Sequence, residues 1–173
     1  ALLFLTMPLL RGRDLAAVIK DQGALDPGIA VRLIVDAAEG VAELHRAGVV
    51  HRDIKPSNLF AHETDDGEIV IKVCDLGIAK DDAERVAALT QTGTVLGSPL
   101  YMAPEQLLSA RGVDARADVW SLAMSLYELL AGVPALDGSR SFAELVGRLA
   151  AGDFPEVTTV APWIPGALGR VIG

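Results

Sequence analysis

The sequence has little cysteine, few aromatic residues and no excess of basic charge. A single cysteine, Cys74, leaves no internal disulfide and excludes a cysteine-rich zinc site. We therefore expect a reducing, cytoplasmic location, with any membrane anchor in a segment outside this chain. The 23 acidic residues outnumber the 15 basic ones and give a formal net charge of −8. This argues against nucleic acid as a partner, because phosphate backbones bind basic surfaces.

Long uninterrupted hydrophobic runs are also lacking. Residues 119–136 have the length of a membrane span, but Glu128, Gly132 and Pro134 interrupt them, so a buried core helix is expected. The first ten residues lack the basic leader and the cleavage site of a signal peptide, and they lack an initiating Met. With 173 residues, 51% of them hydrophobic, the chain is expected to form one globular domain.

Hydrophobic periodicity predicts an α+β chain in which helices dominate. The first half is expected to contain a strand over 2–7, a turn at Gly12, a short helix over 14–20, a long helix from Asp26 to Gly48, and short strands at 49–50, 59–61 and 69–73. The second half is expected to contain an exposed segment over 77–104 and helices over 104–109, 114–131, 141–152 and from 164 onward. No repeat or second domain is indicated.

Polar residues interrupt the apolar pattern most sharply between Val49 and Phe60. Arg52, Asp53, Lys55 and Asn58 stand there among strand-like residues. Charged groups near a core are unfavourable unless they are paired or used, so this stretch is a candidate site. Each residue alone could equally be an ordinary turn residue or a solvated charge.

Three motifs in this order resemble the catalytic half of a eukaryotic-like, bacterial-type serine/threonine protein kinase. They are HRDIKPSN at 51–58, DLG at 75–77 and APE at 103–105. The resemblance implies a protein-kinase-like fold in which residues 1–173 form a partial domain: the hinge and a mostly helical C-terminal lobe with short β-hairpins. The glycine-rich loop and the strand lysine of the N-terminal β lobe are missing from the sequence, so we expect an excerpt of a larger kinase, or else a one-lobed protein.

The resemblance also implies catalytic and metal-binding roles. ATP and Mg²⁺, with Mn²⁺ as an alternative, would be the cofactors, and Ser/Thr hydroxyls of proteins would be the acceptors. Phosphoryl transfer requires mainly positioning and charge neutralisation. Asp53 would accept the hydroxyl proton, and Lys55 would meet the transferring phosphate. Asn58 and Asp75 would offer the oxygen ligands that Mg²⁺ prefers.

Structural roles are implied for a second set of residues. His51 would pack under the DLG motif, and Asp118 would hold the backbone of the catalytic loop. Leu76 would need a buried apolar environment, and Gly77 would permit unusual backbone geometry. Glu105 pairs in the family with an arginine further along, which this sequence does not contain.

The adenine side of the site rests on the resemblance alone. Met7 resembles the gatekeeper, and Pro8 and Leu10 would lend backbone groups to the base. Asp14 would meet the ribose. Leu15 and Phe60 would pack against the adenine. An ordinary strand and loop would explain residues 7–14 equally well.

Regulation and acceptor choice are implied by residues around the activation segment. Arg52 beside Asp53 marks kinases whose activation segment is ordered by phosphorylation. Thr90, Thr92 and, more weakly, Thr94 match the positions that are modified in that segment. These threonines could also be mere loop composition. Ser98 would lie beside Asp53 and Lys55 and favour Ser/Thr acceptors. A kinase dimer would allow autophosphorylation in trans.

Two other function classes remain open. A pseudokinase lobe would bind without catalysis, but intact Asp53, Asn58 and Asp75 weigh against it. A small-molecule phosphotransferase would use a related fold, but the APE motif and the threonine-rich segment weigh against it.

Overall fold

The computed structural model describes residues 7–76, 98–108 and 112–172. The expectations for Gly77, Thr90, Thr92 and Thr94, and for the strand over 2–6, lie outside these residues.

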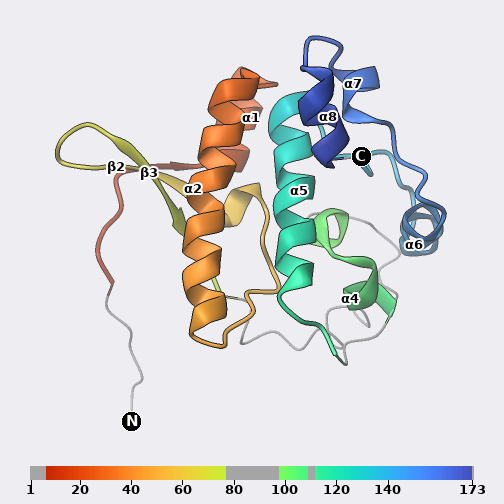
Figure 1. Ribbon diagram of the computed structural model, residues 1–173, viewed down its shortest axis with the longest axis horizontal. Coiled ribbons are helices and arrows are strands. Elements are labelled where there is room, and N and C mark those ends of the chain that lie inside the picture. The colour runs from red at the N-terminus through yellow and green to blue at the C-terminus, as the bar shows by residue number, and fades with distance from the viewer. Residues whose placement is uncertain (1–6, 77–97, 109–111, 173) are drawn as a thin grey trace.

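Two long helices, α2 (Pro27–Arg46) and α5 (Arg116–Ala131), lie side by side at the centre of the molecule (Figure 1). Helix α2 begins as predicted: the Asp26 carboxylate accepts hydrogen bonds from the N–H groups of Gly28 and Ile29. One face of α2 buries Ala30, Ile34, Ala37 and Val41. Helix packing against α5 thus builds the main core.

Helix α5 is buried around most of its circumference, which explains its membrane-like composition. Leu129 and Leu130 are fully buried, and Gly132 ends the helix in a left-handed conformation with φ of 78°. The predicted core helix is therefore confirmed, although it begins at Arg116 rather than Asp114. Within the described ranges, no helix is both long enough and apolar enough to cross a membrane.

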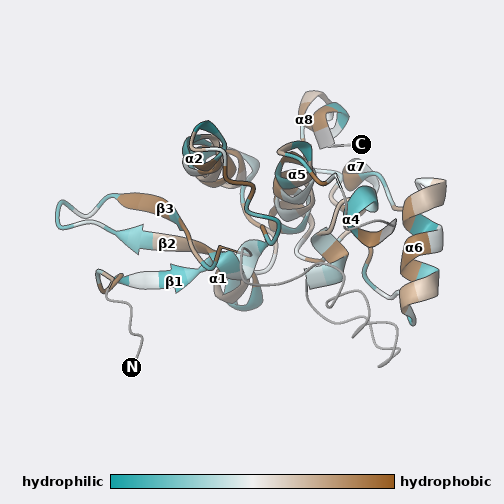
Figure 2. Cartoon of the chain, turned by 90° about the horizontal axis from the view of Figure 1, so that it is seen from below, coloured by the Kyte–Doolittle hydropathy of each residue, from teal (hydrophilic) through white to brown (hydrophobic). Residues whose placement is uncertain are grey.

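A three-stranded antiparallel sheet has the order β1 (Gly12–Asp14), β2 (Leu59–Glu63), β3 (Ile69–Val73). Figure 2 shows it extending away from the helices. The β2–β3 hairpin and its turn, with Gly67 at φ of 79°, are as predicted. Gly12 lies in a strand, where a turn was expected. A Cβ there would lie 2.0 Å from the carbonyl oxygen of Ala61, and φ is 129°, so only glycine fits this approach.

The strand expected at 49–50 is not formed. The N–H of Val49 instead donates to the carbonyl of Leu44, so this stretch completes the end of α2. Helix α1 (Leu15–Gln22) lies between β1 and α2 in the chain and is close to the predicted range.

Short elements complete the described chain: η1 (Pro56–Asn58), η3 (Ser98–Tyr101), α4 (Pro104–Leu108), α6 (Phe142–Ala151), α7 (Val157–Val160) and α8 (Gly166–Ile172). The N–H of Glu144 donates to the Ser141 hydroxyl at 3.2 Å, which confirms the predicted cap of α6. Pro99 and Tyr101 are buried, so the end of the segment predicted to be exposed is in fact packed.

Candidate active site

Polar side chains of the loop between α2 and β2 converge on Asp53. The ammonium of Lys55 lies 3.4 Å from the Asp53 carboxylate. The Asn58 side-chain amide donates to the carbonyl of Asp53 at 2.7 Å and to its carboxylate at 3.3 Å. Asp53 and Asn58 are only 4% and 5% exposed. A carboxylate this buried requires such partners, and the loop supplies them from within five residues.

The backbone of this loop is held by Asp118 of α5, as the sequence predicted. Its carboxylate, which is fully buried, accepts from the N–H of His51 at 2.9 Å and from the N–H of Arg52 at 2.8 Å. Arg52 has φ of 65°, a left-handed conformation that a non-glycine residue adopts only where its surroundings impose it. Asp118 is part of what imposes it.

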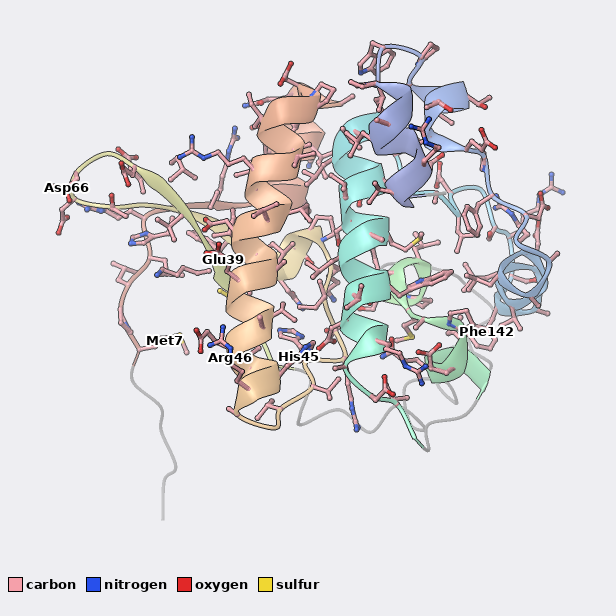
Figure 3. All side chains as sticks on the ribbon, viewed as in Figure 1. Met7, Glu39, His45, Arg46, Asp66 and Phe142 are labelled. Carbon is pink, nitrogen blue, oxygen red and sulfur yellow. The ribbon has the colours of Figure 1, made fainter. Side chains whose placement is uncertain are left out.

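His45, at the end of α2, was not predicted from the sequence. Its Nε2 lies 2.7 Å from the Asp118 carboxylate, and Figure 3 shows its side chain on the side of α2 that faces α5. In the sequence this residue is indistinguishable from a histidine that simply favours a helix C-terminus. Only the packing of α2 against α5 reveals it as a partner of Asp118.

His51 links the catalytic loop to the residue before Asp75. Its Nδ1 accepts the N–H of Asp53 at 3.3 Å, so Nε2 carries the proton and donates to the carbonyl of Cys74 at 3.0 Å. The ring is fully buried. The contact gives His51 a structural role, as expected, although its partner is Cys74, just before the DLG motif.

The residue before Asp75 is bonded to Asn58: the N–H of Cys74 donates to the carbonyl of Asn58 at 2.9 Å. Asp75 is exposed and has φ of 55°. Because the amide nitrogen of Asn58 donates to Asp53, its amide oxygen is the atom that would face a metal ion. Burial, with the charge of Asp75 adding to it, raises the pKa of the Cys74 thiol. Cys74 is therefore a neutral thiol rather than a reactive thiolate.

These oxygens suit a divalent-cation site that phosphate and water would complete. Within the part of the chain that the structure describes, no three His, Cys, Asp or Glu side chains gather around one point. A divalent ion would thus take one or two protein oxygens, from Asn58 and Asp75, and further ligands from phosphate and water, as Mg²⁺ prefers.

Residues of the segment 98–106 contact the loop from the other side. The Lys55 ammonium donates to the Ser98 hydroxyl at 2.6 Å, so Ser98 lies beside Lys55, one of the two neighbours that the sequence predicted for it. Gln106, unexpected from the sequence, donates to the carbonyl of Arg52 at 3.0 Å. Glu105 is exposed on α4.

Leu76 and Leu15 correct two expectations. Leu76 is 43% exposed and belongs to none of the hydrophobic clusters of described residues, so the burial expected of it is not found. Leu15 is fully buried in the main core, so it has no surface to offer to an adenine ring. An apolar residue at a strand–helix junction can line a pocket or lie in the core, and Leu15 lies in the core.

The remaining adenine-side residues are only partly brought together. Asp14 and Phe60 are paired neighbours on β1 and β2. The Asp14 carboxylate accepts the N–H of Ala17 at 2.9 Å and thereby caps α1. Met7 is 74% exposed on the chain leading away from the sheet (Figure 3), Pro8 is exposed and Leu10 is half-buried.

Comparison with known proteins identifies the family. A protein kinase domain model matches residues 1–151. A probable serine/threonine-protein kinase of Corynebacterium efficiens is 36% identical over 81% of this chain and 20% of its own length. The serine/threonine-protein kinase PknL of Mycobacterium tuberculosis is 35% identical over 94% of this chain and 39% of its own length. PknB of the same species is 38% identical over 78% of this chain and 21% of its own length.

The chain therefore belongs to the protein kinase family, and its fold is part of a protein kinase domain. It spans only between 20% and 39% of the length of these relatives.

Proposed function

We propose that the protein containing this chain transfers the γ-phosphate of ATP to Ser and Thr hydroxyls of other proteins. The observation that carries this proposal is the buried Asp53 carboxylate, with Lys55 at 3.4 Å and Asn58 bonded to the same carboxylate. Phosphoryl transfer needs a positioned acceptor for the hydroxyl proton and cations around the phosphate, and this cluster supplies the protein's part of both.

Each residue of the cluster has a distinct role in the proposal. Asp53 orients the acceptor hydroxyl and takes its proton, and Lys55 meets the transferred phosphate as a point charge. Asn58 and Asp75 hold divalent ions, Mg²⁺ or alternatively Mn²⁺, which supply charge neutralisation when bound. His51 and Asp118 keep the loop in shape.

The acceptor class, regulation and location are part of the same proposal. The hydrogen bond between Lys55 and Ser98 supports a protein Ser/Thr acceptor, because it ties the segment preceding α4 to the catalytic loop. Phosphorylation of Thr90 or Thr92 activates the enzyme, because Arg52 then binds the phosphate. One kinase of a dimer phosphorylates the other in trans. The catalytic part acts in the cytoplasm.

Asp53→Asn in the intact protein tests the assignment. Phosphate transfer from Mg-ATP to a basic protein acceptor is expected to fall by at least about 10²-fold, since general-base groups typically contribute 10²–10⁴-fold. Asp66→Asn is the matched control, because Asp66 is exposed at the tip of the β2–β3 hairpin (Figure 3). Full activity in Asp53→Asn would contradict the role of Asp53. Nucleotide binding by the wild type without any transfer would favour a pseudokinase.

A further inference from the structure

Gln106 is a buried polar residue of α4 whose side-chain amide is used at both ends. Its Nε2 donates to the carbonyl of Arg52 at 3.0 Å, and its Oε1 accepts from the N–H of Ala103 at 3.1 Å. The residue is only 1% exposed. A buried amide in two hydrogen bonds has one well-defined orientation, so Gln106 is a fixed link between α4 and the catalytic loop.

The carbonyl that Gln106 binds belongs to the peptide group that immediately precedes Asp53. The N–H of this same peptide group donates to Nδ1 of His51 at 3.3 Å. Both polar atoms of the Arg52–Asp53 peptide are therefore held, one by a ring in the loop and one by α4. These two bonds oppose changes in ψ of Arg52 and in φ of Asp53, either of which would move the Asp53 side chain relative to Lys55 and Asn58.

The backbone conformation of Arg52 makes this support necessary. With φ of 65°, Arg52 is in a region that costs free energy for a residue with a side chain. The carboxylate of Asp118 holds its N–H at 2.8 Å, and Gln106 holds its carbonyl. The strained residue is thus clamped between α5 and α4.

We infer that Gln106 is a positioning residue for phosphate transfer: it fixes the peptide plane that aims Asp53, and it couples the segment 98–106 to that carboxylate. The inference rests on the proposed function, since its consequence for rate passes through Asp53. Gln106 contacts no reacting group itself. A side chain that merely anchored α4 would affect stability alone.

Two variants separate the hydrogen bond to Arg52 from the rest of the contacts. Gln106→Glu keeps the side-chain shape and an oxygen for the Ala103 N–H, but it places an acceptor against the Arg52 carbonyl. Gln106→Met removes both bonds without adding charge. Gln22→Glu makes the same chemical change at an exposed position on α1 and serves as the control.

Steady-state kinetics of the intact protein provide the first readout. We expect kcat for a protein acceptor to fall by about 10–100-fold in Gln106→Glu and Gln106→Met, because small misplacements of catalytic groups have effects of this size. The KM for ATP is expected to stay within about twofold, and the folded fraction by circular dichroism to stay that of the wild type. Unchanged kcat, or a loss equal to the loss of folded protein in both variants, would overturn the inference.

Amide hydrogen exchange provides a second readout that does not depend on activity. The N–H of Asp53 should exchange at least several-fold faster in both variants than in the wild type or in Gln22→Glu, because its peptide plane is released. Unaltered protection in both variants would count against Gln106. If the wild type transfers no phosphate, the proposed function fails while the exchange experiment still decides whether Gln106 positions this peptide.

Discussion

The ammonium of Lys55 donates a 2.6 Å hydrogen bond to the hydroxyl of Ser98, 43 residues further along the chain. The same ammonium lies 3.4 Å from the Asp53 carboxylate. One cation thus joins the segment that leads into α4 to the proposed catalytic carboxylate. An acceptor hydroxyl bonded to Asp53 would therefore lie near this cation.

Removal of the Ser98 hydroxyl should weaken transfer to protein acceptors. Hydrogen bonds to charged groups are worth about 1.5–3 kcal/mol, so Ser98→Ala is expected to lower kcat/KM for the acceptor about tenfold or more. Ser98→Thr keeps a hydroxyl and should retain most activity. Initial rates of the intact protein with varied acceptor peptide measure this. Equal activity of the alanine and threonine variants would show that the hydroxyl is not used.

Asp118→Asn should lower the free energy of unfolding. The Asp118 carboxylate now accepts from the N–H groups of His51 and Arg52 and contacts the ring of His45. Asparagine keeps one acceptor oxygen but replaces the other with an NH₂ group, which cannot accept. Each buried N–H left without an acceptor costs about 1–3 kcal/mol. Urea unfolding measures the free energy of unfolding, with Asp153→Asn, exposed just after α6, as the control. Equal stability of the two variants would contradict the supporting role of Asp118.

Local signals in the sequence were enough for the longer helices, but not for the short helix α7 or for the long-range contacts. Asp26 and Ser141 cap α2 and α6 through neighbours a few residues away, so spacing alone predicts them. His45 and Gln106 meet partners 73 and 54 residues away, which no local pattern encodes. Leu15 shows the same limit, because lining and core positions share one hydrophobic signature.

Glu128 should make stability depend on pH in a defined direction. It accepts a hydrogen bond from the Tyr101 hydroxyl at 2.6 Å inside the core. Burial raises its pKa above the ordinary 4.5, although the bond from Tyr101 opposes this shift. Between the two pKa values the native state binds more protons than the unfolded state, so the free energy of unfolding falls as pH rises from 4.5 through the raised value.

Glu128→Gln keeps an acceptor for Tyr101 and removes the titration. The free energy of unfolding of this variant, measured in urea from about pH 4 to 8, is therefore expected to lack that fall. The difference in free energy of unfolding between Glu128→Gln and the wild type should therefore increase through this pH window and then become constant. Parallel profiles for the two proteins would show that Glu128 titrates at an ordinary pKa.

Autophosphorylation should occur on Thr90 or Thr92 in the intact protein. Arg52→Ala is expected to reduce the resulting activation roughly tenfold, the equivalent of one charge-assisted hydrogen bond to phosphate. Arg52→Lys keeps the charge without the bidentate geometry and should fall in between. Peptide mass spectrometry locates the phosphate, and rates before and after phosphatase treatment measure activation. Phosphate found only outside 90–94 would refute the assignment.

The 173 residues tested alone are expected to transfer no phosphate, even though Asp53, Lys55, Asn58 and Asp75 are all present. Their sequence contains neither the glycine-rich loop nor the N-terminal-lobe lysine that hold the phosphates of ATP in the kinase family. Lost positioning can be worth about 7–11 kcal/mol of a barrier.

Exposed apolar side chains should make this chain associate when it is tested alone. Leu76 is 43% exposed and Phe60 is half-buried, so both leave apolar area open to solvent. Purified chain would be assayed with Mg-ATP and a protein acceptor, and its mass measured by light scattering. The expected result is an inactive, associating species. Robust phosphate transfer by a monomer would mean that the loop around Asp53 can position ATP without the groups that the kinase family uses for its phosphates.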